Sequence, residues 1–369
     1  MGCVVLVILL VSFGLINGES KVRDSKPHPL RKITVDSFGY GDFKTIQSAI
    51  DSVPSNNKQW ICIYVKSGIY REKVLIPMDK PFILLQGEGR NNTIIALDDH
   101  MTLAESPTFS SFADNFAAKH ISFKNTYNIE DPMGKNPRTP AVAALIAGDK
   151  SSFYKCNFFG LQDTLWDMQG RHYFKSCHIE GAVDFIFGMG QSIYEKCVIF
   201  VIAEKLDPYG RWLYPGYITA QGRNSPTDAN GFVFKNCAVF GNGVAYLGRA
   251  WRDYSRVLFY NSSLSNIIVP QGWDAWDFDG HEYDITFAEV SCYGLGSNTS
   301  GRVSWLKKLS YSTVINLIDL NFIDTEGWLR RQPLHKNMLK LIAIFLSLNA
   351  EFTLESYRNE TLIVVLSLS

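Results

Sequence analysis

The sequence lacks an excess of charge of either sign, since its 36 Lys and Arg residues are balanced by 36 Asp and Glu residues. Proteins that bind nucleic acids usually carry a basic excess or a basic stripe, so we expect no nucleic-acid partner. The neutral balance also provides no long-range attraction for an acidic polymer. An acidic substrate would therefore have to be recognised by local groups.

The N-terminal region lacks a hydrophobic run long enough to span a membrane. The apolar run from Val4 to Ile16 is interrupted by Ser12 and Gly14 and is followed by polar residues. This length is typical of a secretory signal, although the usual positively charged start is missing. We therefore predict a signal peptide at residues 1–18 and no membrane span, while an N-terminal anchor stays open as the alternative.

Acceptor sequons for N-linked glycans agree with secretion. They begin at Asn91, Asn261, Asn298 and Asn359. The sequence thus predicts a secreted, extracellular glycoprotein.

The cysteines recur with a fixed period. Cys156, Cys177 and Cys197 are 21 and 20 residues apart, and Cys237 follows after 40. Aromatic and Lys residues precede them, and short β-type runs lie between them, with too little sequence for a crossover helix. Coils of about twenty residues predict a parallel β-helix, an all-β fold in which neighbouring coils share one core and the cysteines form an interior ladder. A disulfide framework and a β-sandwich stay open as rivals.

The ends of the repeat region have their own signals. Apolar residues at helical spacing between Asp42 and Val53 predict a short N-terminal capping helix, with Asp42 as N-cap and Pro54 marking the end. No linker divides residues 30–333, which we interpret as one domain. The tail at 334–369 contains an apolar run from Leu339 to Leu348 and has no structural prediction.

Three ionisable residues lie inside apolar, strand-like sequence: Asp163, Asp184 and Arg249. The two aspartates are 21 residues apart, which is one coil, so stacking would place them on adjacent rungs about 5 Å apart. Two carboxylates this close resist joint ionisation, so one can attack while the other donates a proton. Arg249 could hold the charged one by a bidentate contact. A purely structural Asp–Arg pair remains an alternative.

Several motifs together resemble the plant pectin methylesterase (pectinesterase) family. They run in the family's order from about Lys32 to Pro333, and they are specific as a set. They are Gly68-Ile69-Tyr70-Arg71-Glu72, Gln162-Asp163-Thr164-Leu165, Val183-Asp184-Phe185-Ile186-Phe187-Gly188, Thr219-Ala220-Gln221-Gly222-Arg223, Leu247-Gly248-Arg249 and Gly272-Trp273-Asp274-Ala275-Trp276.

The resemblance implies a right-handed parallel β-helix without a metal or other cofactor. It implies Asp184 as the nucleophile that attacks a C6 methyl ester of homogalacturonan, and Asp163 as the acid and then the base. Arg249 would orient the nucleophile, and Gln162 would stabilise the oxyanion. The aromatic residues that would pack against the sugar chain are Phe187, Trp251 and Trp273.

The chain departs from the family pattern at Pro140, where a second oxyanion glutamine is expected. Proline has neither a side-chain amide nor a backbone N–H to donate. A slower esterase, or an inactive pectin-binding relative, is therefore predicted. Ala250 replaces a common proline, which we expect to matter little. The resemblance begins soon after the predicted signal, as in a short form without the N-terminal inhibitor-like region.

The expected partners are methyl-esterified pectin and a proteinaceous inhibitor, and the expected location is the cell wall. A pectin-cleaving hydrolase or lyase on the same fold is a weaker alternative. The adjacent acidic pairs Asp98-Asp99 and Glu130-Asp131 would point to opposite faces of a strand. We find no cluster of acidic ligands for a Ca²⁺ ion, and no Gly-x-Ser-x-Gly motif that would indicate a serine nucleophile.

Overall fold

The computed structural model describes residues 30–130, 136–207 and 214–334. Residues Leu30–Pro333 form one compact unit. The predicted signal peptide at 1–18 and almost all of the tail at 334–369 lie outside the described residues. In the described part, no helix is long and apolar enough to cross a membrane.

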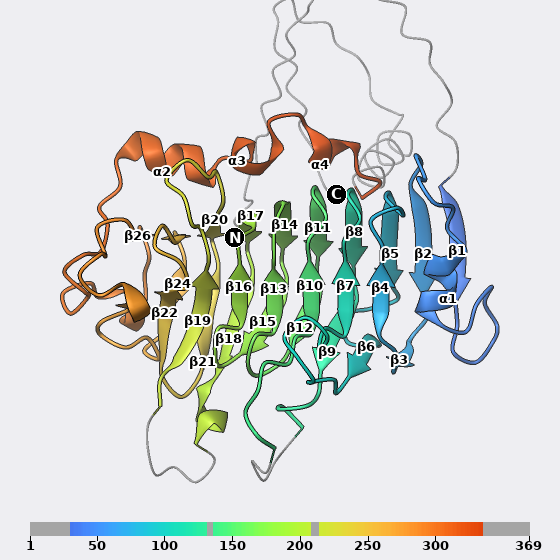
Figure 1. Ribbon diagram of the computed structural model, residues 1–369, viewed down its shortest axis with the longest axis horizontal. Coiled ribbons are helices and arrows are strands. Elements are labelled where there is room, and N and C mark those ends of the chain that lie inside the picture. Colours follow the sequence, from blue (N-terminus) through green and yellow to red (C-terminus); the bar gives the residue numbers. More distant parts are fainter. Residues whose placement is uncertain (1–29, 131–135, 208–213, 335–369) are drawn as a thin grey trace, which may run out of the picture. The chain divides into compact units, whose positions relative to one another are not determined.

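Three parallel sheets wind around one interior, and each coil between β2 and β25 contributes one strand to each sheet (Figure 1). The first sheet has the order β1 (Arg31–Val35), β2 (Ile61–Val65), β5 (Ile83–Gly87), β8 (Phe116–Lys119), β11 (Ser151–Tyr154), β14 (Arg171–Lys175), β17 (Gln191–Glu195), β20 (Gly231–Lys235), β23 (Arg256–Tyr260) and β26 (Thr286–Val290). The second has β3 (Gly68–Tyr70), β6 (Thr93–Leu97), β9 (Ser122–Asn125), β12 (Asn157–Phe159), β15 (His178–Gly181), β18 (Val198–Ile202), β21 (Ala238–Asn242) and β24 (Ser263–Leu264). The third has β4 (Val74–Ile76), β7 (Phe109–Ser111), β10 (Ala144–Ile146), β13 (Leu165–Asp167), β16 (Ile186–Gly188), β19 (Gly216–Gln221), β22 (Ala245–Ala250) and β25 (Trp273–Asp274). The prediction of a right-handed parallel β-helix is confirmed, and the β-sandwich alternative is wrong.

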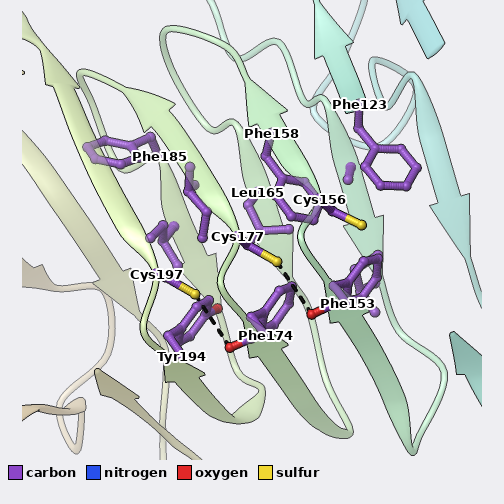
Figure 2. Packing of buried hydrophobic residues seen from close by; sticks show 14 of the residues in the cluster. Phe123, Phe153, Cys156, Phe158, Leu165, Phe174, Cys177, Phe185, Tyr194 and Cys197 are labelled. Carbon is purple, nitrogen blue, oxygen red and sulfur yellow. Dashed lines mark hydrogen bonds between the residues drawn. The ribbon is translucent and has the colours of Figure 1, made fainter. Parts of the chain in front are cut away.

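Aromatic side chains stack inside the coils, because the parallel register brings equivalent residues above one another (Figure 2). Phe153 and Phe174 stack with ring centroids 4.9 Å apart, and Phe174 and Tyr194 at 4.6 Å. The stack continues through Phe234 and Phe259 at 4.6 and 4.4 Å. This fully buried column supplies the apolar area that one short coil could not bury alone.

The cysteines form the predicted interior ladder, and all six cysteines of the described part are free thiols. The thiols of Cys177 and Cys197 donate to carbonyls of the previous coil, Cys177 to Phe153 at 3.4 Å and Cys197 to Phe174 at 3.4 Å (Figure 2). The disulfide framework is therefore wrong. The repeat has a backbone cause as well, since the residue before each ladder cysteine adopts a positive φ at the turn into the second sheet.

Helices cover the N-terminal end and one outer face. Helix α1 (Ile46–Asp51) packs against β1, β2 and β4, as the predicted capping helix should. Its N-cap is Thr45 rather than Asp42, because the Thr45 side chain accepts from the Ser48 N–H while Asp42 accepts from the Thr34 N–H. The carboxylate of Glu72 accepts from the N–H groups of Ile46 and Gln47, which gives the last residue of the motif at 68–72 a structural role.

Further along the chain, three helices lie on the outside of the first sheet, where apolar residues of β14, β17, β20 and β23 pack against them (Figure 1). They are α2 (Tyr311–Ile318), α3 (Asn321–Asp324) and α4 (Trp328–Arg331). Short 3₁₀ helices occur at η1 (Ala203–Leu206), η2 (Trp276–Phe278) and η3 (Leu295–Ser297).

Candidate active site

A single row of side chains crosses the outer face of the third sheet from coil to coil. The strand register pairs its members successively, and they are Leu145, Trp166, Phe187, Ala220, Arg249 and Asp274. The first four belong to an apolar cluster separate from the main core. The row therefore passes from apolar to charged side chains along the helix axis.

A cleft opens where the row reaches β16, β19 and β22. Its lining comprises Leu103, Gln162, Asp163, Asp184, Phe187, Ala220, Arg249, Trp251 and Trp276. The structure therefore brings together six of the seven predicted site residues.

The two aspartates occupy equivalent turns of adjacent coils. Asp163 lies between β12 and β13, Asp184 lies between β15 and β16, and the Asp163 N–H donates to the Val183 carbonyl at 3.0 Å. Their exposed fractions are 7% and 6%. Both have a left-handed backbone, with φ of 60° and 47°, as the residues before the ladder cysteines also have, so this conformation belongs to the turns between the sheets.

Arg249 binds Asp184 through both oxygens of the carboxylate. Its Nε donates to Oδ1 at 2.8 Å, and its Nη2 donates to Oδ2. The close approach of this strand to β19 requires Gly248, because a Cβ there would meet the Thr219 Oγ1 at 2.0 Å. The sequence Leu-Gly-Arg thus places the guanidinium directly over the neighbouring coils.

The two carboxyl groups have different electrostatic surroundings. Burial and the negative charge of Asp184 raise the pKa of Asp163 well above its ordinary value, against the weaker effect of Arg249. Burial also raises the pKa of Asp184, but the hydrogen bonds and charge of Arg249 oppose this rise. Asp184 is thus the carboxyl that ionises first, and Asp163 is the one that retains its proton.

Gln162 lies in the cleft beside Asp163. Its side-chain amide has no hydrogen bond to another described residue, so it is free to face a ligand. Pro140 is half-buried and is not among the lining residues of the cleft, although the adjacent Ala141 N–H donates to the Gln162 carbonyl at 3.3 Å. The chain therefore carries one side-chain amide at this end of the cleft, where two were expected.

Phe187 and Trp251 both line the cleft, with ring centroids 6.0 Å apart, and their contact with a sugar chain stays a prediction. The prediction for Trp273 is wrong. Trp273 is 1% exposed, stacks on Phe287 at 4.5 Å and donates its indole N–H to Glu289 at 3.0 Å, so it belongs to the core. Trp276 of the same motif lines the cleft instead.

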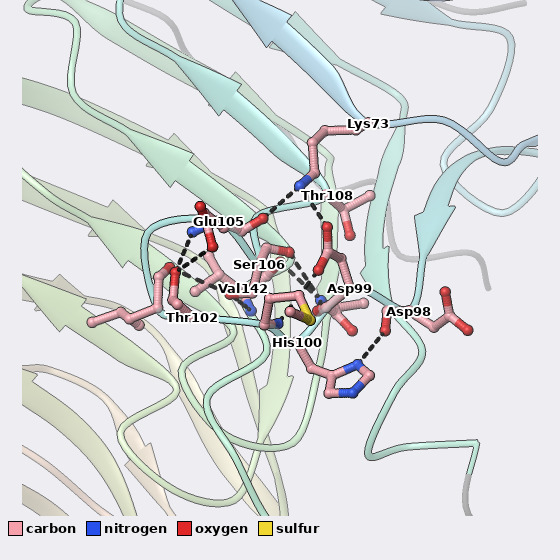
Figure 3. A network of polar contacts seen from close by, with 12 residues as sticks. Lys73, Asp98, Asp99, His100, Thr102, Glu105, Ser106, Thr108 and Val142 are labelled. Carbon is pink, nitrogen blue, oxygen red and sulfur yellow. Dashed lines mark hydrogen bonds and ion pairs between the residues drawn. The ribbon is translucent and has the colours of Figure 1, made fainter.

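Leu103 was not predicted, and it comes from a loop at 98–108 that the neighbouring coils hold in place (Figure 3). The buried amide of Asn125 donates to the Asp99, Ser106 and Val142 carbonyls at 2.8, 3.3 and 3.2 Å. Lys73 pairs with Asp99 at 2.5 Å (Figure 3). These contacts fix one wall of the cleft, and no sequence motif predicts them.

The part of the chain that the structure describes contains no group of three or more His, Cys, Asp or Glu side chains that could hold a metal ion. The cleft offers a carboxylate, a carboxylic acid, a guanidinium and an amide within one small space. This set can perform acyl transfer with a carboxylate nucleophile.

Comparisons with known proteins agree with this site. The pectinesterase family model matches residues 32–327. The "Probable pectinesterase 29" of Arabidopsis thaliana is 58% identical over 306 residues, covering 82% of this chain and 90% of that protein. "Probable pectinesterase 55" of the same plant is 56% identical, covering 82% of this chain and 91% of that protein.

Solved structures of pectin methylesterases are similar to this chain in fold. The pectin methylesterase from carrot aligns with a TM-score of 0.75 and 31% identity, covering 84% of this chain and 98% of that one. A pectin methylesterase in complex with a hexasaccharide has the same fold, with a TM-score of 0.69 and 24% identity over 81% of this chain and 98% of that one. The chain therefore belongs to the pectinesterase family. Pectinesterases are carboxylic-ester hydrolases that remove methyl groups from pectin.

Proposed function

We propose that the cleft hydrolyses the C6 methyl esters of homogalacturonan pectin, with Asp184 as nucleophile and Asp163 as acid and base. The observation that carries this proposal is the bidentate Arg249–Asp184 contact beside a second, unpaired carboxyl. One group is thereby kept ionised and the other protonated, as the reaction needs.

In the first step, an Asp184 oxygen attacks the carbonyl carbon of the methyl ester. The tetrahedral intermediate collapses as the bond to the methoxy oxygen breaks, and Asp163 gives its proton to the departing methanol. A mixed anhydride then joins the galacturonate carbonyl to Asp184. In the second step, Asp163 takes a proton from water, and the attack of this water releases the acid and restores Asp184.

Gln162 is the donor that we assign to the oxyanion. Its amide lies in the cleft next to Asp163, where charge develops on the former carbonyl oxygen. Loss of one oxyanion donor costs about 10²–10³ in turnover. Pro140 cannot supply the second donor, so we expect a slower enzyme than one with a glutamine at this position.

Phe187, Trp251 and Trp276 provide the apolar faces against which a sugar ring would pack. A pectin methylesterase of the same fold has been solved in complex with a hexasaccharide, which supports pectin binding. The row from Leu145 to Ala220 extends this surface over further coils, as a polymeric substrate requires.

Secretion to the cell wall, glycosylation and recognition by a proteinaceous inhibitor belong to the same proposal. Secretion and glycosylation are supported by the sequons at Asn91, Asn261 and Asn298, whose asparagines are all exposed. Recognition by an inhibitor is expected from the family resemblance alone. Glycosidase treatment of the secreted protein, followed by mass measurement, tests the first two. Titration of activity with an inhibitor extract from plant cell walls tests the third.

A catalytically silent pectin-binding protein is the second candidate, and Pro140 is the observation that favours it. This candidate predicts pectin binding that does not change in Asp184→Ala, with no methanol released by the wild type.

Methanol release from highly methylated pectin separates the two candidates. We expect release by the wild type, loss of release in Asp184→Ala, and release that is faster by up to about 10²–10³-fold in Pro140→Gln. A folded wild type that binds pectin but releases no methanol, together with an active Pro140→Gln variant, would establish the silent binder.

A further inference from the structure

Asp274 connects Tyr217 on β19 with Trp276, which follows β25. It lies at the end of β25, next to Arg249 in the strand register. Its Oδ2 accepts a hydrogen bond from the Tyr217 hydroxyl at 2.9 Å, and its Oδ1 accepts one from the Trp276 N–H at 2.7 Å. Both oxygens of this carboxylate therefore have a defined donor.

The two residues that Asp274 holds are also the two whose rings contact the guanidinium of Arg249. The guanidinium carbon lies 3.6 Å from the Trp276 ring centroid and 4.2 Å from the Tyr217 ring centroid. These distances are well within the range of cation–π contacts. One carboxylate thus fixes both aromatic contacts of the arginine that binds Asp184.

The backbone of Trp276 adopts a conformation that a tryptophan rarely has, so surrounding contacts must stabilise it. Trp276 has a φ of 57°, which is unusual for a bulky residue. The hydrogen bond from its N–H to Asp274 closes the turn that holds this conformation. In this conformation the indole ring of Trp276 lies against the guanidinium of Arg249.

We propose that Tyr217, Asp274 and Trp276 are positioning residues that fix the side chain of Arg249, and through it the carboxylate of Asp184, for attack. This inference rests on the proposed function. None of the three needs to touch the reacting ester for this role. An arginine side chain has several rotatable bonds, and productive geometry tolerates displacements of about 0.5 Å.

Asp274 has a second effect, through its charge. The groups that face Asp184 are Arg249 on β22, Asp163 on the adjacent coil, and Asp274 on β25. Burial and the negative charge of Asp274 raise the pKa of Asp184, and Arg249 lowers it. Because Asp184 must be ionised to attack, removal of the Asp274 charge should move the acid limb of kcat/KM to lower pH.

The test compares Tyr217→Phe, Asp274→Asn and the double variant with the wild type. Tyr217→Phe keeps the ring but removes the hydroxyl, whereas Asp274→Asn keeps an acceptor for the Trp276 N–H but removes the charge. Tyr246→Phe is the matched control, because Tyr246 stacks on Tyr217 at 5.1 Å and has no hydrogen bond to Asp274 in the described part.

We expect each single variant to lower kcat about 3–10-fold with KM unchanged, because the lost interaction orients a catalytic group rather than binding pectin. The double variant should be no slower than the slower single one, since the Tyr217 hydroxyl acts through Asp274. Asp274→Asn should also move the acid limb of kcat/KM down by about 0.5 pH unit. Tyr246→Phe should match the wild type in kcat, KM and pH profile.

The proposal would be overturned if Tyr217→Phe and Asp274→Asn had the same kcat and pH profile as the control Tyr246→Phe. It would also be overturned if the loss of kcat in the double variant were the full product of the two single losses. If the wild type releases no methanol, the readout becomes the Asp184 carboxyl itself, titrated by ¹³C NMR and assigned with Asp184→Asn. A lower Asp184 pKa in Asp274→Asn, and no change in Tyr246→Phe, would then support the positioning role even though the proposed function had failed. An unchanged Asp184 pKa in Asp274→Asn would contradict it.

Discussion

The interior of the β-helix and the outer face of its third sheet follow the same register but use it in opposite ways. In the interior, each coil repeats its neighbour, and the stacked rings are Phe153, Phe174, Tyr194, Phe234 and Phe259. On the outer face, the row changes from the stacked rings of Trp166 and Phe187 to Ala220, Arg249 and Asp274. Repetition builds a continuous core, while variation brings different chemical groups together.

The comparison implies that stability and activity can be changed separately. A substitution in the interior column should lower the free energy of unfolding and leave the chemistry of folded molecules unchanged. A substitution of a cleft aspartate should lower activity without lowering the free energy of unfolding. Burial disfavours the charged form of both aspartates, so removing one of them removes an unfavourable group from the folded state.

The largest expected effect is on the outer face. Asp163→Asn should lower kcat by about 10²–10⁴-fold, because an amide can neither protonate methanol nor activate water. Methanol release normalised to folded protein measures this loss. Asp98→Asn, on the exposed loop, is the control with the same chemical change, and it should stay within about twofold of the wild type.

The next effect is on the interior. Phe174→Ala should lower the free energy of unfolding by about 3–5 kcal/mol, because it removes one ring from the stacked column and leaves a cavity. Chemical denaturation measures this cost. Phe240→Ala, at a phenylalanine that is 42% exposed on β21, should cost less than about 1 kcal/mol. Equal losses at the two positions would contradict the stacked core.

A smaller effect concerns how the stability contribution of Asp163, in the outer cleft, depends on pH. The pKa of Asp163 is raised in the folded state, so the folded protein binds this proton more tightly than the unfolded chain. The contribution of Asp163 to stability is therefore present below the ordinary aspartate pKa and is lost as the pH rises through the folded pKa. Asp163→Asn should raise the melting temperature by a few degrees at neutral pH, and this gain should vanish near pH 3–4. A constant difference at all pH values would argue against the raised pKa.

The smallest effect is expected in the cysteine ladder. Because the six cysteines of the described part are free thiols, a reducing agent should leave the melting temperature unchanged. Thiol labelling of the denatured, unreduced protein should modify Cys156, Cys177 and Cys197. Failure to label any of these three would indicate a disulfide that the ladder excludes.

The repeat was predictable from sequence because its cause is local and recurs. The spacing of Cys156, Cys177 and Cys197 reflects one coil, and the same period predicted that Asp163 and Asp184 would be neighbours. Arg249 was predictable for another reason, since a lone cation in an apolar strand needs a buried anion.

The errors lie where the regular pattern ends. Trp273 and Trp276 occur in one short motif, but β25 has two residues and the turn after it has a positive φ, so strand alternation cannot decide which ring faces the cleft. Asp42 and Thr45 are both acceptable N-caps, and the competing hydrogen bond from Thr34 decided between them. Leu103 enters the cleft through loop contacts made by residues distant in sequence, which no local signal encodes.

The central claim is that Asp184 becomes covalently attached to the substrate, and an activated aryl ester of an oligogalacturonate tests it most directly. An aryl oxide leaves without protonation, so Asp163→Asn should still be acylated but should lack the base for hydrolysis. Rapid mixing should then release one equivalent of the phenol per enzyme, with the added acyl mass on the peptide that contains Asp184. The same burst in the Asp163→Asn, Asp184→Asn double variant, or no burst in Asp163→Asn, would contradict the account.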